Sequence, residues 1–299
     1  MEHDVIVVGG AFAGLSAALQ LARARRRVLV IDSGLPRNRF AAHAHGILGH
    51  DGKPPAQILE ESRAQLLAYP SARVLHATAA TANPVDGGFA VALDGGGVHT
   101  AARLILAGGI RDVLPALDGL RERWGVSVLH CPYCHGYEVA DRPLGVLAAH
   151  ALSAHQAALI PDWGPTTYFT QGEFEPDPEQ AAHLSARGVS IERVPVVGLL
   201  GVAPQLDGVR LADGRTLAIS ALFTAPASTM ASPLAEQLGC EFEQGPLGQH
   251  IRVDEWKATS VAGVYAAGDA ASAMQNASLA IAAGVLAGVG AHQSLIRAH

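Results

Sequence analysis

Apolar and polar residues alternate in blocks over the first 32 positions. Residues 5–8 form an unbroken apolar run, residues 9–14 are rich in glycine, residues 15–25 have helical spacing, and residues 28–31 are apolar again. Continuous apolar runs are typical of strands that are covered on both faces, as in parallel sheets. The segment therefore predicts a strand–helix–strand unit, with Asp32 at the end of its second strand.

The same patterns recur further along the chain. Strands are expected at 89–93 and 104–107, where Gly108 and Gly109 close the second run. A second strand–helix–strand unit is expected over 144–147, 153–160 and 166–169, followed by hairpin strands around 208–217. A late strand and turn covers 264–269, and an alanine-rich helix begins at about Ala277.

Two such units, one inserted into the other, predict an α/β protein with two Rossmann-like domains. Residues 1–115 and 243–299 are expected to form the first domain. Residues 116–242 are expected to form the inserted one.

Composition narrows the class of protein. With 49% hydrophobic and 16% charged residues, the chain can bury a large core, which excludes intrinsic disorder. The net charge of −6, from 21 basic and 27 acidic residues, makes nucleic acid an unfavourable partner. Apolar stretches are interrupted before the roughly 18 residues that a membrane span requires, and the N-terminus has no basic signal-peptide region. We therefore expect a cytoplasmic protein with no membrane partner.

The first glycine-rich turn has the chemistry of a dinucleotide site. Gly9 and Gly14 are the outer residues of a Gly-x-Gly-x-x-Gly frame that follows a strand and opens a helix, where backbone amides can face a pyrophosphate. Asp32 could accept hydrogen bonds from both ribose hydroxyls. A plain glycine turn is the alternative. The middle glycine is replaced by Ala11, and the residues assigned to cofactor binding here are Gly9, Gly10, Ala11, Phe12, Ala13, Gly14 and Asp32.

Cys131 and Cys134 form a Cys-x-x-Cys pair, which can close a reversible disulfide and lower the pKa of one thiol. Three cysteines in a chain of this length do not make a disulfide scaffold. His130 and His135 flank the pair, but adjacent residues converge poorly on a tetrahedral zinc ion. Cys-Pro-Tyr-Cys also occurs in glutaredoxins, at the start of a much shorter chain, and two inert buried cysteines are a further alternative. Cys240 is interpreted as a packing residue.

A third motif lies near the C-terminus. Residues 263–269 (Gly-Val-Tyr-Ala-Ala-Gly-Asp) place Gly268 and Asp269 on a turn directly after an apolar strand. This resembles the C-terminal motif of flavoproteins with two dinucleotide folds, in which the aspartate holds the ribityl chain of FAD. Residues 104–109, including Gly108, resemble the Ala-Thr-Gly strand of the same proteins. The resemblance implies that the first domain binds FAD.

The order of these motifs resembles the low-molecular-weight thioredoxin reductases over essentially the whole chain. The resemblance implies that Cys134 lies nearest the flavin and forms the charge-transfer thiolate, and that Cys131 exchanges with the substrate. His135 occupies the position of the catalytic aspartate and could move the thiol proton. Arg39 and His50 lie in segments that the family places along the flavin. A homodimer is expected on the same ground.

The NADPH motifs of those reductases are missing from the inserted domain. Their second glycine turn aligns with Ala148, His150 and Ser153, and a histidine conflicts with close approach of a pyrophosphate. The arginines that bind the 2′-phosphate should follow residues 166–169, but Thr-Gln-Gly-Glu stands there. We therefore expect that NADPH is not the electron donor of this enzyme.

The run from Cys131 to Glu138 (Cys-Pro-Tyr-Cys-His-Gly-Tyr-Glu), with residues 37–40 and 43–46 upstream, is similar to the gliotoxin- and holomycin-type dithiol oxidases. The resemblance implies an FAD-dependent oxidase that closes a disulfide in a small dithiol, with O2 as acceptor. The first alternative is a reductase of thioredoxin-like proteins with another donor, such as ferredoxin. The second is a non-catalytic flavin-binding redox sensor. His43, His45 and His50 are interpreted as lining the flavin or substrate. Metal ligation and a solvated loop are the alternatives for this segment, and no metal ion is expected.

Overall fold

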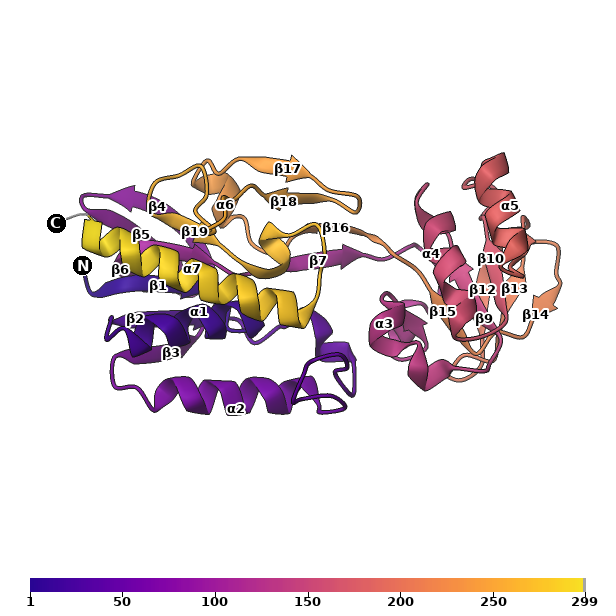
Figure 1. Ribbon diagram of the computed structural model, residues 1–299, viewed down its shortest axis with the longest axis horizontal. Coiled ribbons are helices and arrows are strands. Elements are labelled where there is room, and N and C mark those ends of the chain that lie inside the picture. The colour runs from indigo at the N-terminus through magenta and orange to yellow at the C-terminus, as the bar shows by residue number, and fades with distance from the viewer. Residues whose placement is uncertain (298–299) are drawn as a thin grey trace.

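The computed structural model describes residues 1–297 and consists of two α/β bodies (Figure 1). Two antiparallel strands, β7 (Ile110–Val113) and β16 (Ala227–Met230), join them. The predicted fold class, with one dinucleotide-type domain inserted into another, is confirmed.

The first body is built on a seven-stranded sheet in the order β3-β2-β1-β6-β5-β4, with β19 also paired to β6. Strands β1, β2, β3, β6 and β19 run parallel, as the unbroken apolar runs predict. Its elements are β1 (His3–Val8), α1 (Phe12–Arg23), β2 (Val28–Asp32), α2 (Pro55–Leu67), β3 (Ala72–His76), β4 (Ala79–Val85), β5 (Gly88–Leu93), β6 (Val98–Leu106), α6 (Leu234–Gln237), β17 (Phe242–Gln244), β18 (Gln249–Ile251), β19 (Val264–Ala266) and α7 (Ala277–Arg297).

The inserted body has a five-stranded parallel sheet in the order β11-β10-β9-β15-β8 and a three-stranded antiparallel sheet beside it. The predicted second strand–helix–strand unit is present as β9, α4 and β10, with β9 and β10 parallel. The elements are β8 (Val128–Leu129), α3 (Pro132–His135), β9 (Leu144–Leu147), α4 (Ser153–Leu159), β10 (Thr166–Phe169), α5 (Pro178–Ala186), β11 (Ser190–Glu192), β12 (Val196–Leu200), β13 (Gly208–Leu211), β14 (Thr216–Leu217) and β15 (Ala221–Phe223).

The chain returns to the first body earlier than the sequence predicts. Leu234 and Leu238 on and after α6, with Cys240, pack in the same buried cluster as Ile6 and Leu29. Residues 231–242, which were assigned to the inserted domain, therefore belong to the first. The reason is that α6 is a single short turn whose few apolar residues do not indicate which sheet they cover.

Helix α7 is the one described helix that is long and apolar enough to cross a membrane, which corrects the expectation that no such stretch exists. It runs along α1 in the structure (Figure 1). A Cβ on Gly284 would overlap the carbonyl of Ala13, and one on Gly288 would lie 2.7 Å from the carbonyl of Ala17. The two helices thus pack backbone to backbone within the core of the first body.

Candidate functional site

The carboxyl edge of the first parallel sheet gathers the predicted cofactor residues. Gly9 follows β1, Asp32 ends β2, Gly108 follows β6, and Gly268 and Asp269 follow β19. Because these strands are parallel and neighbouring, their ends meet at one edge. Ligands of open α/β sheets bind outside this edge.

The first glycine turn can be built only with glycine at its two ends. Gly9 has φ +106°, and a Cβ there would overlap the carbonyl of Ala107. A Cβ on Gly14 would overlap the carbonyl of Gly9. Ala11 precedes α1 with an ordinary φ of −95° and makes no side-chain cap, so its methyl group introduces no backbone strain and leaves the first amides of α1 uncapped by side chains.

The two glycine turns contact each other. Gly268 has φ +76°, and a Cβ on it would lie 2.8 Å from the Cβ of Ala13 in the first turn of α1. The start of α1, which includes Phe12, therefore lies directly against the turn that carries Asp269. Two glycine turns that lie far apart in the chain are therefore in direct contact here.

Asp32 is held in place by three donors. Its Oδ1 accepts from the backbone N–H of Gly10 (3.2 Å) and of Gly34 (3.1 Å), and its Oδ2 accepts from Nη2 of Arg63 (2.9 Å). A carboxylate has about four acceptor sites, so Asp32 keeps capacity for a ribose hydroxyl. Arg63 was not predicted, because it lies on α2 and no motif links it to Asp32.

A second carboxylate network surrounds Asp269. Arg37 donates through Nε and Nη2 to Asp112 on β7, and through Nη1 to Oδ2 of Asp269 at 3.2 Å. Burial raises the pKa of Asp269, and the Arg37 charge opposes this shift. Burial opposes the charge of Arg37 itself, but its hydrogen bonds to Asp112 keep the pKa of the guanidinium raised. Arg37 thus ties the connecting strand to the predicted ribityl-binding residue, a role that the sequence analysis did not assign.

Two predicted cofactor residues do not join these networks in the structure. Arg39 is exposed, its guanidinium lies 4.2 Å above the ring of Phe40, and Nη1 donates to the carbonyl of Pro36. The Nδ1 atom of His50 is buried and has no hydrogen-bond partner within residues 1–297. A buried nitrogen without a hydrogen-bond partner costs free energy unless a ligand or a water molecule binds to it. Cofactor binding by His50 therefore stays a prediction, and this nitrogen gives a physical reason for it.

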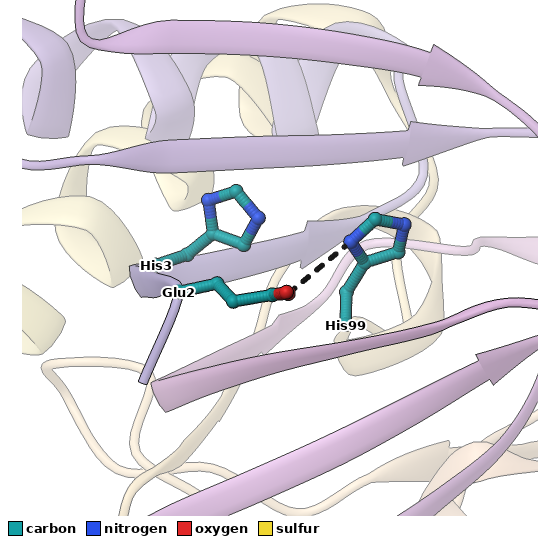
Figure 2. Close-up of side chains that lie close together, drawn as sticks. All are labelled: Glu2, His3 and His99. Carbon is teal, nitrogen blue, oxygen red and sulfur yellow. Dashed lines mark ion pairs between the residues drawn. The ribbon is translucent and has the colours of Figure 1, made fainter.

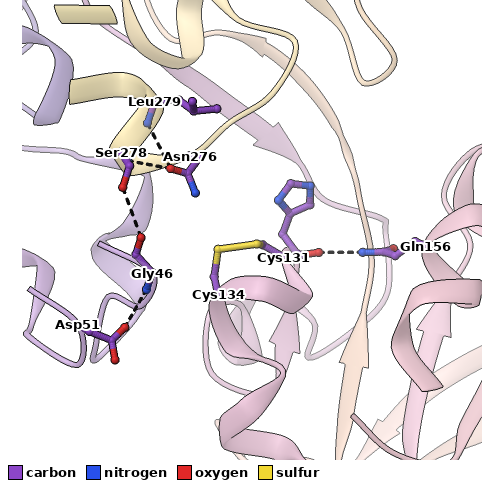
Figure 3. The surroundings of a disulfide bond; sticks show 9 residues. Gly46, Asp51, Cys131, Cys134, Gln156, Asn276, Ser278 and Leu279 are labelled. Carbon is purple, nitrogen blue, oxygen red and sulfur yellow. Dashed lines mark hydrogen bonds between the residues drawn. A yellow bond between two sulfur atoms is a disulfide. The ribbon is translucent and has the colours of Figure 1, made fainter. Parts of the chain in front are cut away.

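Cys131 and Cys134 form a disulfide in the inserted body, with their Cα atoms 5.3 Å apart. Cys131 is the residue before α3, Pro132 opens the helix, and Cys134 lies within it. Figure 3 shows the disulfide facing the first body, opposite the 46–51 loop and the start of α7. Those two segments contact each other, because Oγ of Ser278 donates to the carbonyl of Gly46 (3.4 Å).

His135 directly follows Cys134 and is partly buried. Burial lowers the pKa of its imidazole below the ordinary value of 6.5, the Glu138 carboxylate opposes that shift, and His45 adds to it. His45 itself connects the two bodies, with Nε2 3.3 Å from Glu138 and Nδ1 3.5 Å from Asp51. The disulfide and its neighbouring histidine therefore lie where the inserted body touches the first.

The turn after β9 is filled by its own side chains. Oγ of Ser153 accepts from the backbone N–H groups of Ala149 (3.0 Å) and His150 (3.3 Å), and Nδ1 of His150 accepts from the N–H of Leu152 (3.1 Å). A phosphate-binding turn would present such amides to its ligand. The loss of the glycine pattern is thus accompanied by an internal hydrogen-bond network in the same turn.

Arginines close to the second sheet are engaged in ion pairs. Arg193, which follows β11, donates to Glu175 at 2.6 Å, and Arg187 donates to Asp162 at 2.7 Å. Gln171, in the Thr-Gln-Gly-Glu segment, exchanges hydrogen bonds with the backbone of Val196. At the ends of β10 and β11, Gln171 and Arg193 therefore already have hydrogen-bond or ion-pair partners within the protein.

Comparison with known proteins gives consistent matches. The sequence profile of the pyridine nucleotide-disulphide oxidoreductases matches residues 3–158 and 173–284. The thioredoxin reductase tcpT of Claviceps purpurea is 32% identical, over 98% of this chain and 94% of the relative. The thioredoxin reductase sirT of Leptosphaeria maculans is 30% identical, over 96% and 92%. The crystal structure of an oxidoreductase from Agrobacterium tumefaciens superimposes with a TM-score of 0.95 at 47% identity, covering all of both chains.

Proposed function

The chain belongs to the pyridine nucleotide-disulphide oxidoreductase family, and from this premise we propose that it is an FAD-dependent dithiol oxidase. Its substrate is a small dithiol, in which it closes an intramolecular disulfide, and O2 is the electron acceptor. The observation that carries the proposal is the hydrogen-bond network of Ser153 and His150, which uses the amides that a nicotinamide dinucleotide would need. A disulfide enzyme of this family without a pyridine-nucleotide site must exchange electrons with another partner.

The residues at the carboxyl edge of the first sheet fit FAD. The turn at Gly9–Gly14 leaves no room for a Cβ at either end and presents the start of α1 toward the pyrophosphate position. Asp32 would bind the ribose hydroxyls, and Asp269, oriented by Arg37, would bind the ribityl chain. When bound, FAD supplies two-electron redox chemistry between thiols and oxygen.

The cysteine pair performs the thiol exchange. A substrate thiolate attacks Sγ of Cys131, the Cys131–Cys134 bond breaks, and Cys134 leaves as a thiolate. The second substrate thiol then attacks the mixed disulfide, which releases the ring disulfide and leaves Cys131 reduced. The substrate loses two electrons and two protons. The enzyme disulfide gains the two electrons, His135 accepts one proton and solvent the other, and over the whole reaction both electrons and two protons convert O2 to hydrogen peroxide. Small dithiols that can close a ring are favoured because the second attack is intramolecular.

His135 would hold the proton in this exchange. Its imidazole follows Cys134 in the chain, and burial keeps its pKa low, so it is neutral at pH 7 and able to accept a proton. Cys134 is the thiol assigned to the flavin side. Cys131 is assigned to the substrate side.

The test is oxygen uptake by the FAD-loaded protein with dithiothreitol as the probe dithiol. We expect uptake by the wild type with formation of hydrogen peroxide, slower uptake with 2-mercaptoethanol, and loss of uptake in Cys131→Ser. Cys240→Ser is the matched control, because Cys240 is buried in the first body and should not take part. Equal uptake in the wild type and in Cys131→Ser would contradict the proposal.

One observation favours a second function. Two relatives at 30–32% identity are called thioredoxin reductases. If the wild type takes up no oxygen with dithiols but reduces thioredoxin when supplied with reduced ferredoxin, the assignment as a thioredoxin reductase is correct. A flavin-binding redox sensor would neither take up oxygen with dithiols nor lose its flavin absorbance when dithiols are added.

A further inference from the structure

Three potential metal ligands meet at the amino end of the first sheet, far along β1 from the candidate active site. His3 is the first residue of β1 and pairs in register with Ala101 of β6, and His99 lies two residues earlier on β6. Side chains two residues apart on a strand lie on the same face of a sheet. The two imidazoles therefore come out side by side, with ring centres 5.9 Å apart.

Glu2 completes the cluster, and Thr100 of β6 holds it there through its hydroxyl and its backbone N–H. Its N–H donates to Oγ1 of Thr100 (3.2 Å), and its Oε2 accepts from the N–H of Thr100 (3.4 Å). The same oxygen lies 3.5 Å from Nδ1 of His99. Figure 2 shows the carboxylate pointing toward His99 with the His3 ring beside it. One donor atom from each of the three residues lies within 4.8 Å of the others.

We propose that Glu2, His3 and His99 form a binding site for a divalent first-row metal ion, with zinc as its natural probe. Two imidazole nitrogens and one carboxylate oxygen are a common ligand set for Zn2+, with water in the fourth position. Donors bound to Zn2+ at 2.0–2.1 Å lie about 3.4 Å apart, so the Glu2–His99 pair already has that spacing. A donor nitrogen of His3 lies within 4.8 Å of the donor atoms of both partners, so the His3 ring must move closer to them to bind the same ion.

The local charges permit such an ion. Glu2 contributes a negative charge. Two positive charges lie nearby, on Arg73 and on Arg27, whose guanidinium is paired with Asp4 at 2.8 Å. Burial is the largest cause that lowers the pKa of His3, and both arginines add to it, which favours the neutral imidazole that binds metal. Imidazole and carboxylate ligands select zinc, nickel or copper over calcium and magnesium, which prefer oxygen ligands. A bound ion would fasten the beginning of the chain to β6, so it would act on local stability and leave the thiol chemistry untouched.

The experiment is calorimetric titration of the untagged, FAD-loaded protein with ZnCl2, without reductant so that Cys131 and Cys134 stay in their disulfide. The variants are His3→Ala and His99→Ala. The controls are His155→Ala, which removes an exposed histidine of α4, and His45→Ala, which tests the histidine-rich loop. Circular dichroism of each variant shows that it is folded.

We expect about one equivalent of Zn2+ to bind to the wild type and to both controls, with a dissociation constant below about 100 µM. In His3→Ala and His99→Ala that constant should rise by about tenfold or more. A rise of less than tenfold in either variant, loss of the equivalent in His45→Ala, or no binding to the wild type below about 100 µM would overturn the site. Co2+ in place of Zn2+ gives a second readout, since a tetrahedral Co2+ site adds absorbance at longer wavelengths than the flavin, and the His99→Ala protein should show no such addition.

Discussion

In the proposed thiol exchange, His135 is the residue that would accept the proton. Its imidazole is partly buried beside the contact between the two bodies, and this burial favours the neutral form by removing water from the charged one. Glu138 partly offsets this, because a nearby carboxylate stabilises the imidazolium. The pKa of His135 is lowered on balance, so the imidazole should remain a base below pH 6.5.

The first prediction concerns the pH dependence of turnover. The rate of dithiol oxidation should fall as pH decreases through the pKa of His135, that is, at a pH below 6.5. His135→Gln should lower the rate by about 10²-fold and remove this inflection, because general bases typically contribute that much. The measurement is a pH–rate profile at saturating dithiol, with His155→Gln as the matched exposed histidine. Identical profiles for the wild type and His135→Gln would rule out this role.

The two networks at Asp32 and Asp269 show a second feature at the residue scale. Both carboxylates are oriented by arginines, Arg63 and Arg37, that lie far from them in the chain. An arginine on an ordinary helix or loop carries no sequence signature that marks it as the partner of a distant carboxylate. These arginines could be found only once the fold had brought them to the carboxyl edge of the sheet.

Among the elements, α7 combines an unusual composition with a close packing partner. Its sequence is apolar along most of its length, and its buried residues are mainly small: Gly284, Ala287, Gly288, Gly290 and Ala291. Small residues allow the backbone of α1 to approach, and the carbonyls of Ala13 and Ala17 lie against Gly284 and Gly288. The same packing places the start of α1 beside the turn that carries Asp269.

The second prediction tests this packing. Gly284→Val should lower the free energy of unfolding by about 1–3 kcal/mol, because its Cβ would overlap the carbonyl of Ala13 and one helix must move. Ala282→Val, on the exposed side of the same helix, should change it by about 0.5 kcal/mol or less. Urea unfolding of the two variants gives the comparison. An equal effect of both substitutions would mean that α7 does not pack on α1 in this way.

The whole molecule places the disulfide at the junction of two bodies that only two strands connect. β7 and β16 carry the chain out and back, and Arg37 fastens β7 to the first body through Asp112. His45 contacts Glu138 across the junction. The disulfide consequently faces the 46–51 loop and the start of α7 in the first body (Figure 3), while the hydrogen bonds of the turn after β9 lie within the inserted body.

The third prediction follows from that turn. NADPH at micromolar concentration should not bleach the flavin absorbance of the anaerobic protein, whereas dithiothreitol should. The amides of Ala149 and His150 already donate to Ser153, so a pyrophosphate would have to displace that hydroxyl, and Arg193 is paired with Glu175, so a 2′-phosphate would have to compete with a carboxylate. The measurement is anaerobic stopped-flow absorbance with each reductant. Rapid bleaching by NADPH would refute the prediction.

Much of this molecule is local enough to predict from sequence. The strand–turn–helix around Gly9 and the strand before Asp269 are specified by short runs of apolar residues and by glycine, whose conformational freedom acts within one turn. The spacing of Cys131 and Cys134 is likewise local, since two cysteines three positions apart can close a small disulfide ring. Because parallel strands end at a common edge, these motifs also implied a shared site.

Tertiary structure alone decided the contacts that join distant segments. It assigned residues 231–242 to the first body, placed Arg37 between Asp112 and Asp269, and put His45 beside Glu138. It also brought His99 to the start of the chain, next to Glu2 and His3. Such contacts depend on how whole elements pack against one another. Neither a charged side chain nor a short apolar segment has a local sequence preference for a partner tens or hundreds of positions away.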